Sequence, residues 1–125
     1  MKRISKKEVA ENYLKHLENG DLKHLLEMFN KDGMVDSPLY GIKKAKDFYR
    51  ELKDDTSNSK LQLKGIFEES NSPNLAIYFT YEWTLKNGTE VKFDVVDILE
   101  LDDDFKILQL KIIYDTVDSR ALLKT

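Results

Sequence analysis

Hydrophobic residues in the first third of the chain recur every three or four positions, which is the spacing of an amphipathic helix. Ser5 and Glu8 have the spacing of a capping box and predict that a helix begins there. The apolar stripe that follows comprises Val9, Tyr13, Leu14 and Leu17. Gly20 is placed to end this helix, because glycine readily adopts the left-handed conformation found at helix ends.

Two further helices are predicted before residue 56. Asp21 is placed to cap the second, whose apolar face comprises Leu22, Leu25, Leu26 and Phe29. Turn-forming residues occupy 30–33, and residues 34–37 form a short extended segment that Pro38 ends. After Gly41, the third helix has an apolar face made of Ala45, Phe48, Tyr49 and Leu52. The polar segment 54–60 is interpreted as a loop within the domain.

The second half of the chain changes to the period of two that is typical of strands. Four longer strands are predicted, separated by turns at 71–74, at Asn87-Gly88 and at 102–104. Their apolar faces comprise Leu61, Leu63 and Phe67; Leu75, Ile77, Phe79, Tyr81, Trp83 and Leu85; Val91, Phe93, Val95, Leu99 and Leu101; and Leu108, Leu110, Ile112 and Tyr114. Three helices followed by an antiparallel meander predict an α+β domain. Tyr78, Val96, Ile98 and Ile113 lie on the opposite side, so that face of the sheet is expected to meet a second copy as a homodimer.

Asp97 interrupts the apolar face of the third of these strands. A carboxyl group among hydrocarbon side chains must find a partner, line a polar cavity or hold a proton. In a pocket, a neutral acid can donate a hydrogen bond to a ligand oxygen. Two structural alternatives remain open: Asp97 caps a backbone group, or the register places Val96 and Ile98 inward and exposes Asp97 to water.

Composition and charge narrow the classes of function. The chain has 125 residues, of which 41% are hydrophobic and 34% charged, and this is ordinary for one globular domain. A net charge of −3 and a pI near 5.4 disfavour a nucleic-acid partner. No apolar stretch reaches the ~20 residues of a membrane span, and no cysteine is present. A cytoplasmic location is expected because no signal-peptide pattern follows the basic start.

From about residue 7 to 115, the layout resembles the nuclear-transport-factor-2-like superfamily, which includes ketosteroid isomerases and SnoaL-type polyketide cyclases. The stretches that carry the resemblance are 13–21, ending in Gly20-Asp21, and 95–98. It implies a cone-shaped half-barrel, in which a curved antiparallel or mixed sheet packs against three N-terminal helices. Residues 1–125 would then form a single SnoaL-like domain with a C-terminal tail at 116–125, which is either a short helix or a disordered end. The fold alone does not imply one activity.

The resemblance to ketosteroid isomerases implies roles for particular residues. That family has a tyrosine seven residues before Gly-Asp and a protonated aspartic acid on the third meander strand; Tyr13 and Asp97 occupy these positions. In the family the two groups form an oxyanion hole. The family's general base is an aspartate before a proline, whereas Ser37 precedes Pro38 here. Asp36 is one residue away but on the other face of an extended strand, and a serine hydroxyl alone cannot remove a proton from carbon.

Other side chains are weaker candidates for a ligand site. His16 lies at the edge of the first helical stripe, where it either reaches the cavity or remains on the surface. Phe79, Trp83 and Tyr114 either wall a ligand pocket or form core. The spacing of the two histidines and the acidic residues does not match a metal-binding motif, so neither a metal nor a cofactor is predicted.

Two functions remain compatible with the composition, the resemblance and these candidate residues. The first is an isomerase, cyclase or dehydratase acting on a small hydrophobic carbonyl compound, with Tyr13 and Asp97 on the oxygen and Asp36, His16 or an activated water as base. The second is a non-catalytic ligand-binding or dimerising accessory domain of the same fold. The matched oxyanion pair favours the first, and the absent base favours the second.

Overall fold

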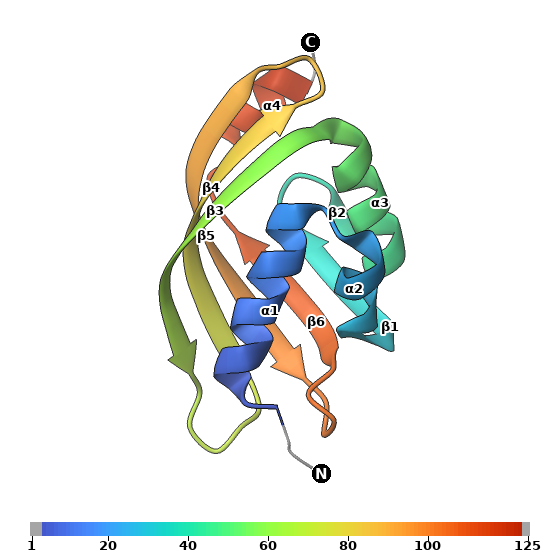
Figure 1. Ribbon diagram of the computed structural model, residues 1–125, viewed down its shortest axis with the longest axis vertical. Helices are drawn as coiled ribbons and strands as arrows, with labels where there is room; N and C mark the ends of the chain where they lie inside the picture. Colours follow the sequence, from blue (N-terminus) through green and yellow to red (C-terminus); the bar gives the residue numbers. More distant parts are fainter. Residues whose placement is uncertain (1–3, 124–125) are drawn as a thin grey trace.

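The computed structural model describes residues 4–123 and contains a curved sheet with helices along it (Figure 1). In chain order the elements are α1 (Lys6–Asn19), α2 (Leu22–Glu27), β1 (Phe29–Ser37), β2 (Gly41–Lys44), α3 (Ala45–Asp55), β3 (Thr56–Glu68), β4 (Leu75–Leu85), β5 (Glu90–Leu101), β6 (Ile107–Ile113) and α4 (Val117–Leu123).

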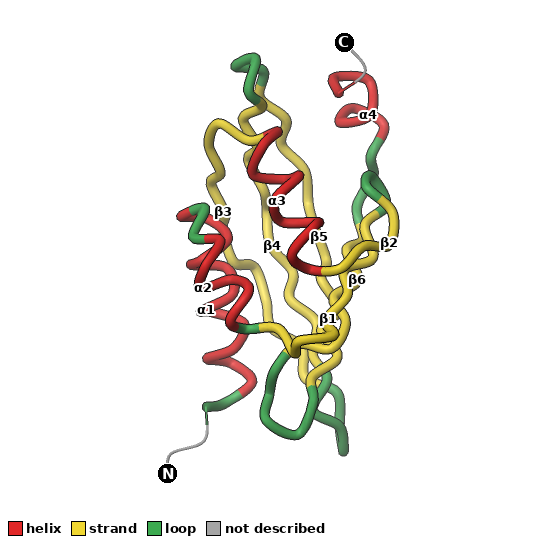
Figure 2. The backbone as a smooth tube through the Cα atoms, turned by 90° about the vertical axis from the view of Figure 1, so that its right-hand side faces the viewer, coloured by secondary structure: helices red, strands yellow, loops and turns green. Residues whose placement is uncertain are grey.

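The six strands form one sheet in the order β2-β1-β6-β5-β4-β3. All neighbouring pairs are antiparallel except β1 and β6, which run parallel, so the sheet is mixed. Helices α1, α2 and α3 lie on one side of the sheet, within its curvature (Figure 2). The predicted α+β half-barrel is therefore confirmed. The tail forms the short helix α4 rather than a disordered end over its described residues.

The first helix begins and ends where the sequence predicts. The Ser5 hydroxyl accepts the Glu8 N–H, and the Glu8 carboxylate accepts the Ser5 N–H, completing a capping box. Gly20 has φ of 64°, and its N–H is donated to carbonyls of the last helical turn. The predicted stripe is buried: Val9, Tyr13, Leu14 and Leu17. The cap and stripe thus place the Tyr13 side chain in the interior.

The long strands β4 and β5 follow the predicted alternation and form the wall that faces the helices. Every second residue of β4 from Leu75 to Leu85 is buried. Register pairs Ile77 with Asp97 and Phe79 with Val95, so the two apolar faces coincide. Asp97 is 2% exposed and faces inward, which excludes the register that would leave it in water. The hairpin at Asn87-Gly88 has φ of 88° at the glycine, as that turn requires.

Three predicted element boundaries are wrong. Phe29 belongs to β1 and not to the second helix, which ends at Glu27. Residues 30–33 lie within β1, although the Asn30 side chain accepts the Asp32 N–H as in a turn, and the register shifts between Phe29 and Met34. The segment 54–60 is not a loop, because α3 continues to Asp55 and β3 starts at Thr56. The short strand β2 had not been predicted.

Register shifts in the strand pairing also place some residues on the face of the sheet opposite to the predicted one. A register shift between Leu63 and Gly65 turns Phe67 to the outer face, where it is 60% exposed, whereas Leu63 pairs with Phe79 before the shift and is 40% exposed on the edge strand β3. Another shift between Glu100 and Leu101 puts Ile107 in the core and leaves Leu108 41% exposed. A bulge adds one residue to one strand and therefore exchanges the faces beyond it.

Over residues 4–123, no helix has the length and apolar character needed to span a membrane.

Candidate functional site

Two tyrosine hydroxyls meet inside the half-barrel. Tyr13 from α1 and Tyr49 from α3 are both buried, and their hydroxyl oxygens lie 2.6 Å apart in a hydrogen bond that either can donate. Their rings meet edge to face, with centroids 6.5 Å apart. Burial is the largest cause that raises the pKa of each tyrosine well above its usual value. Both hydroxyls therefore keep their protons at neutral pH.

Asp97 reaches the same interior from β5. Its Oδ1 is buried and has no hydrogen-bond partner among residues 4–123. Burial raises the pKa of Asp97 well above its usual value, since no partner stabilises a carboxylate there. A charge on Asp97 would raise the pKa values of Tyr13, Tyr49 and Tyr81, which lie within electrostatic reach. Burial therefore favours the protonated form of Asp97, in which the carboxyl group can donate a hydrogen bond.

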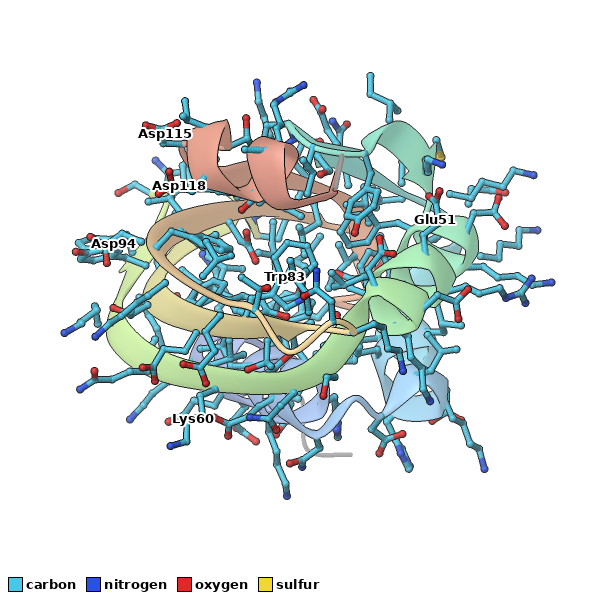
Figure 3. All side chains as sticks on the ribbon, turned by 90° about the horizontal axis from the view of Figure 1, so that it is seen from above. Glu51, Lys60, Trp83, Asp94, Asp115 and Asp118 are labelled. Carbon is cyan, nitrogen blue, oxygen red and sulfur yellow. The ribbon has the colours of Figure 1, made fainter. Side chains whose placement is uncertain are left out.

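These groups line a partly open cavity with a largely aromatic wall. It is bordered by Tyr13, Leu17, Ser37, Tyr40, Phe48, Tyr49, Leu52, Phe79, Tyr81, Trp83, Phe93, Val95, Asp97, Ile112 and Tyr114. Its volume is about 50 Å³, counted as space open to the centre of a water molecule. This exceeds the roughly 10–15 Å³ that one water requires. Viewed from above, Trp83 lies inside the ring formed by the sheet and α3 (Figure 3).

Hydrogen bonds and stacking hold the aromatic wall in place. The Trp83 indole N–H donates to Thr56 Oγ1 at 2.8 Å, and the Tyr81 and Ser59 hydroxyls are 2.9 Å apart. Phe93 stacks on Tyr114 with centroids 4.4 Å apart. Burial raises the pKa of Tyr81 and of Tyr114 to about 12, so both phenols are neutral at physiological pH. The wall therefore offers flat apolar surfaces for a ring-shaped ligand.

Ser37, at the position that the resemblance to ketosteroid isomerases assigned to a general base, lines the cavity, and the backbone uses its hydroxyl oxygen as an acceptor. Its Oγ accepts the N–H groups of Leu39 and Tyr40, each at 3.1 Å. Asp36 is half-buried at the register position opposite Ile42 and Lys111, and it does not border the cavity. No carboxylate other than Asp97 lines the cavity among the described residues. The interior therefore has proton donors and lacks a placed base.

The remaining predicted ligand residues divide into two groups. Phe79, Trp83 and Tyr114 border the cavity together with Tyr13 and Asp97. His16 does not: it is half-exposed and stacks on His24, with centroids 5.3 Å apart. His24 in turn bonds to Asp21 through Nδ1 at 2.6 Å. The helical stripe edge that carries His16 faces α2 rather than the sheet.

Tyr49 is the main site residue that had not been predicted. Its place in the apolar face of α3 was recognised, but its hydroxyl was not assigned a role. A tyrosine within an apolar stripe is itself a signal, because a buried phenol hydroxyl needs a partner. The partner could not be read from α3 alone, since it comes from α1, 36 residues earlier.

Nothing in the described part of the chain indicates a metal centre. Across residues 4–123, no group of three histidine, aspartate or glutamate side chains is arranged to hold an ion. The acidic turn after β5 uses Asp102 to organise itself: its Oδ1 accepts the N–H groups of Asp104 and Lys106. A hydrogen bond from the Asn30 side chain, followed by these two backbone bonds, lowers the pKa of Asp102.

Solved structures with the same architecture belong to proteins of different kinds. An NTF2-like protein of unknown function from Burkholderia pseudomallei has a TM-score of 0.81 and 16% identity, covering 96% of this chain and 98% of that one. TerC, co-crystallised with polyporic acid, has a TM-score of 0.80 and 20% identity, with the same coverage. SalBIII is described as an epoxide hydrolase/cyclase-like enzyme in pyran ring formation in polyether salinomycin. Its structure has a TM-score of 0.76 and 17% identity, covering 90% of this chain and 92% of that one. The sequence has no significant match among curated proteins.

A mixed sheet curved around three helices and enclosing a cavity defines the NTF2-like class of folds. The family model of the SnoaL-like domain matches residues 10–110. The chain therefore belongs to the SnoaL-like domain family.

Proposed function

We propose that this protein binds a small hydrophobic compound bearing a carbonyl or phenol oxygen, and that this oxygen lies against Tyr13 and Asp97. The observation that carries the proposal is the buried Asp97 carboxyl group, whose Oδ1 has no hydrogen-bond partner in the described part of the chain, and which borders the same aromatic cavity as the hydroxyl pair. Polar groups buried without partners cost free energy, so a ligand oxygen that pairs with Asp97 would relieve that cost.

The number of available protons supports an oxygen ligand. Tyr13 and Tyr49 have two hydroxyl protons, and their mutual bond uses one. The remaining proton and that of neutral Asp97 are both free to be donated into the cavity. Two convergent donors stabilise an oxygen that carries partial or full negative charge.

Whether binding is followed by chemistry depends on a base. Enolisation of a carbonyl compound needs a group that removes a proton from carbon. Ser37 accepts two backbone N–H bonds, and Asp36 lies outside the cavity. This arrangement favours ligand binding without proton abstraction. The catalytic alternative, an isomerase, cyclase or dehydratase, is supported by the donor pair and requires a base from the substrate or a bound water.

Titration with β-naphthol tests the binding proposal. This neutral phenol is expected to saturate the wild-type protein with a change in naphthol fluorescence, because its hydroxyl can pair with Asp97 and its rings with the aromatic wall. Competition by equilenin, a larger phenol, would show how far the cavity can expand. Absence of saturable binding by either phenol would refute the proposal.

The substitution Ser37→Asp tests the catalytic alternative. The new carboxylate would be held by the same two N–H groups that now contact the Ser37 hydroxyl, and it would border the cavity. We expect isomerisation of a β,γ-unsaturated cyclohexenone to appear or rise, measured by absorbance of the conjugated product. Ser37→Asn, which has the same shape without a basic carboxylate, is the matched control. Equal rates in the two variants would show that the donor geometry does not support enolisation.

We also propose that the outer face of the sheet pairs two copies of the chain. Tyr78, Val96 and Ile113 are register neighbours on three adjacent strands of that face, beside Ile98, and together they form an apolar row. Ile98 is 37% and Ile113 46% exposed. Sedimentation equilibrium is expected to give a dimer for the wild type and a monomer for Ile98→Lys/Ile113→Lys. A monomeric wild type at micromolar concentration would contradict this proposal.

A further inference from the structure

A second hollow adjoins the cavity and is much larger. This groove has a volume of about 390 Å³ and lies between the end of α1 and the junction of α3 with β3. Four side chains border both spaces: Leu17, Tyr49, Leu52 and Tyr81. At these positions the wall between groove and cavity is one side chain thick.

The cavity is small enough that the mobility of this wall affects which ligands can enter. At about 50 Å³, the cavity is smaller than the roughly 150 Å³ of an apolar protein cavity that takes up benzene. A ring-shaped ligand therefore needs a side chain to move. Leu17 and Leu52 are the aliphatic members of the shared wall, and Leu52 is only half-buried. Rotation of these leucines would join the cavity to the groove.

The groove is polar and rich in hydrogen-bond donors. Lys53, in the last turn of α3, and Lys86, directly after β4, border it, and neither makes an ion pair among the described residues. The Lys86 N–H donates to the Asp55 carbonyl at 3.1 Å, which brings the two segments together. The Asp55 carboxylate is bonded to the Tyr40 hydroxyl, and Tyr40 does not border the groove.

The open edge of β3 adds backbone donors to the groove. β3 is an edge strand, and the Leu61 N–H donates away from the sheet to Glu18 Oε2 at 2.8 Å. Backbone N–H groups alternate sides along a strand, so the Ser59 N–H lies on the same open edge. Glu18 is the only carboxylate that borders the groove within residues 4–123, and it is already engaged by that N–H. Two lysines against one acid leave the groove with a net positive charge.

From this we propose that the groove is a second subsite, which binds an anionic group such as a carboxylate on the ligand whose apolar part fills the cavity. The inference rests on the proposed function for the position of the apolar part. The ligand class becomes amphipathic: a ring system with its oxygen toward Tyr13 and Asp97, and an anion near Lys53 and Lys86. The shared leucine wall separates these two parts until the ligand binds.

Two probes separate the groove from the cavity. β-Naphthol has only the phenol, whereas a hydroxynaphthoate with its carboxylate on the ring remote from the hydroxyl adds the anion. At low ionic strength the wild type is expected to bind the naphthoate about three- to tenfold more tightly than β-naphthol, the range for one or two exposed ion pairs. In Lys53→Gln/Lys86→Gln this preference should fall to about twofold or less, with β-naphthol affinity unchanged.

The control is Lys46→Gln/Lys92→Gln, which removes the same charge from exposed positions that do not border the groove. It should keep the preference for the naphthoate. The proposal is overturned if the wild type has no preference, if the groove variant retains it, or if both double variants lose it equally. If β-naphthol fails to bind while the naphthoate binds through Lys53 and Lys86, the proposed function fails and the anion subsite stands. If neither probe binds, both are refuted.

Discussion

Replacing Asp97 with asparagine is expected to make the protein progressively more stable, relative to the wild type, as the pH rises. In the unfolded chain, Asp97 ionises with an ordinary pKa near 3.9. In the folded protein, burial raises the pKa of Asp97 well above that value, so the carboxyl group keeps its proton to a higher pH than in the unfolded chain. Folding therefore takes up a proton at any pH between the two pKa values, and the contribution of Asp97 to stability falls as the pH rises.

The sign and size of the effect follow from this proton uptake. Below about pH 4 both states are protonated, and the Asp97 carboxyl makes no pH-dependent contribution. Above it, the free energy of unfolding of wild type should fall relative to Asp97→Asn by up to about 1.4 kcal/mol per pH unit, until the folded pKa is reached. An amide does not titrate in this range, so the free energy of unfolding of the variant lacks this dependence on pH.

Urea unfolding of wild type and Asp97→Asn at several pH values between 4 and 8 measures the difference. Asp94→Asn is the matched control, because it is the same substitution at an exposed position of the same strand, on the outer face. A difference for Asp97→Asn that stays constant across this range would show that the carboxyl group is solvated or paired, and the neutral-donor model would be abandoned.

Replacing Tyr13 with phenylalanine is expected to weaken β-naphthol binding by about 1–3 kcal/mol, the range for a buried hydrogen bond left unmade. The ring remains, so the apolar packing of α1 against the sheet is retained. Tyr49→Phe should weaken binding less, because Tyr13 keeps its own proton for the ligand and loses only the neighbour that orients it. The order of the two effects identifies the hydroxyl that contacts the ligand.

Fluorescence titration of both variants gives the two affinities, and thermal unfolding checks that each variant is folded. Tyr40→Phe is the control: Tyr40 borders the same cavity, but its hydroxyl donates to Asp55 at 2.5 Å. Its removal should weaken naphthol binding less than Tyr13→Phe does, because this hydroxyl is already bonded to Asp55 and is not one of the proposed donors. Equal losses in all three variants would point to a general loosening of the cavity, and no loss in Tyr13→Phe would remove Tyr13 from the site.

The elements that form the cavity could be predicted because each has a strong local signal. Ser5, Glu8 and Gly20 define α1 by capping, and the turn at Asn87-Gly88 sets the register of β4 against β5. Where the chain contains a bulge, prediction of faces failed, as at Phe67 and Leu108. A bulge has little local signature, yet it exchanges the inner and outer faces of every residue beyond it.

The sequence by itself determined which side of its own element each candidate residue occupies: Tyr13 on the apolar stripe of a helix and Asp97 on the apolar face of a strand. It could do so because the periods of helices and strands are local properties of the backbone. Only the tertiary structure decided which side chains meet. Docking of α3 inside the curved sheet pairs Tyr49 with Tyr13, leaves Asp97 without a partner and separates the cavity from the groove by a single layer of side chains. These contacts join residues from distant segments, and sheet curvature and register shifts place them, so periodicity within one element does not encode them.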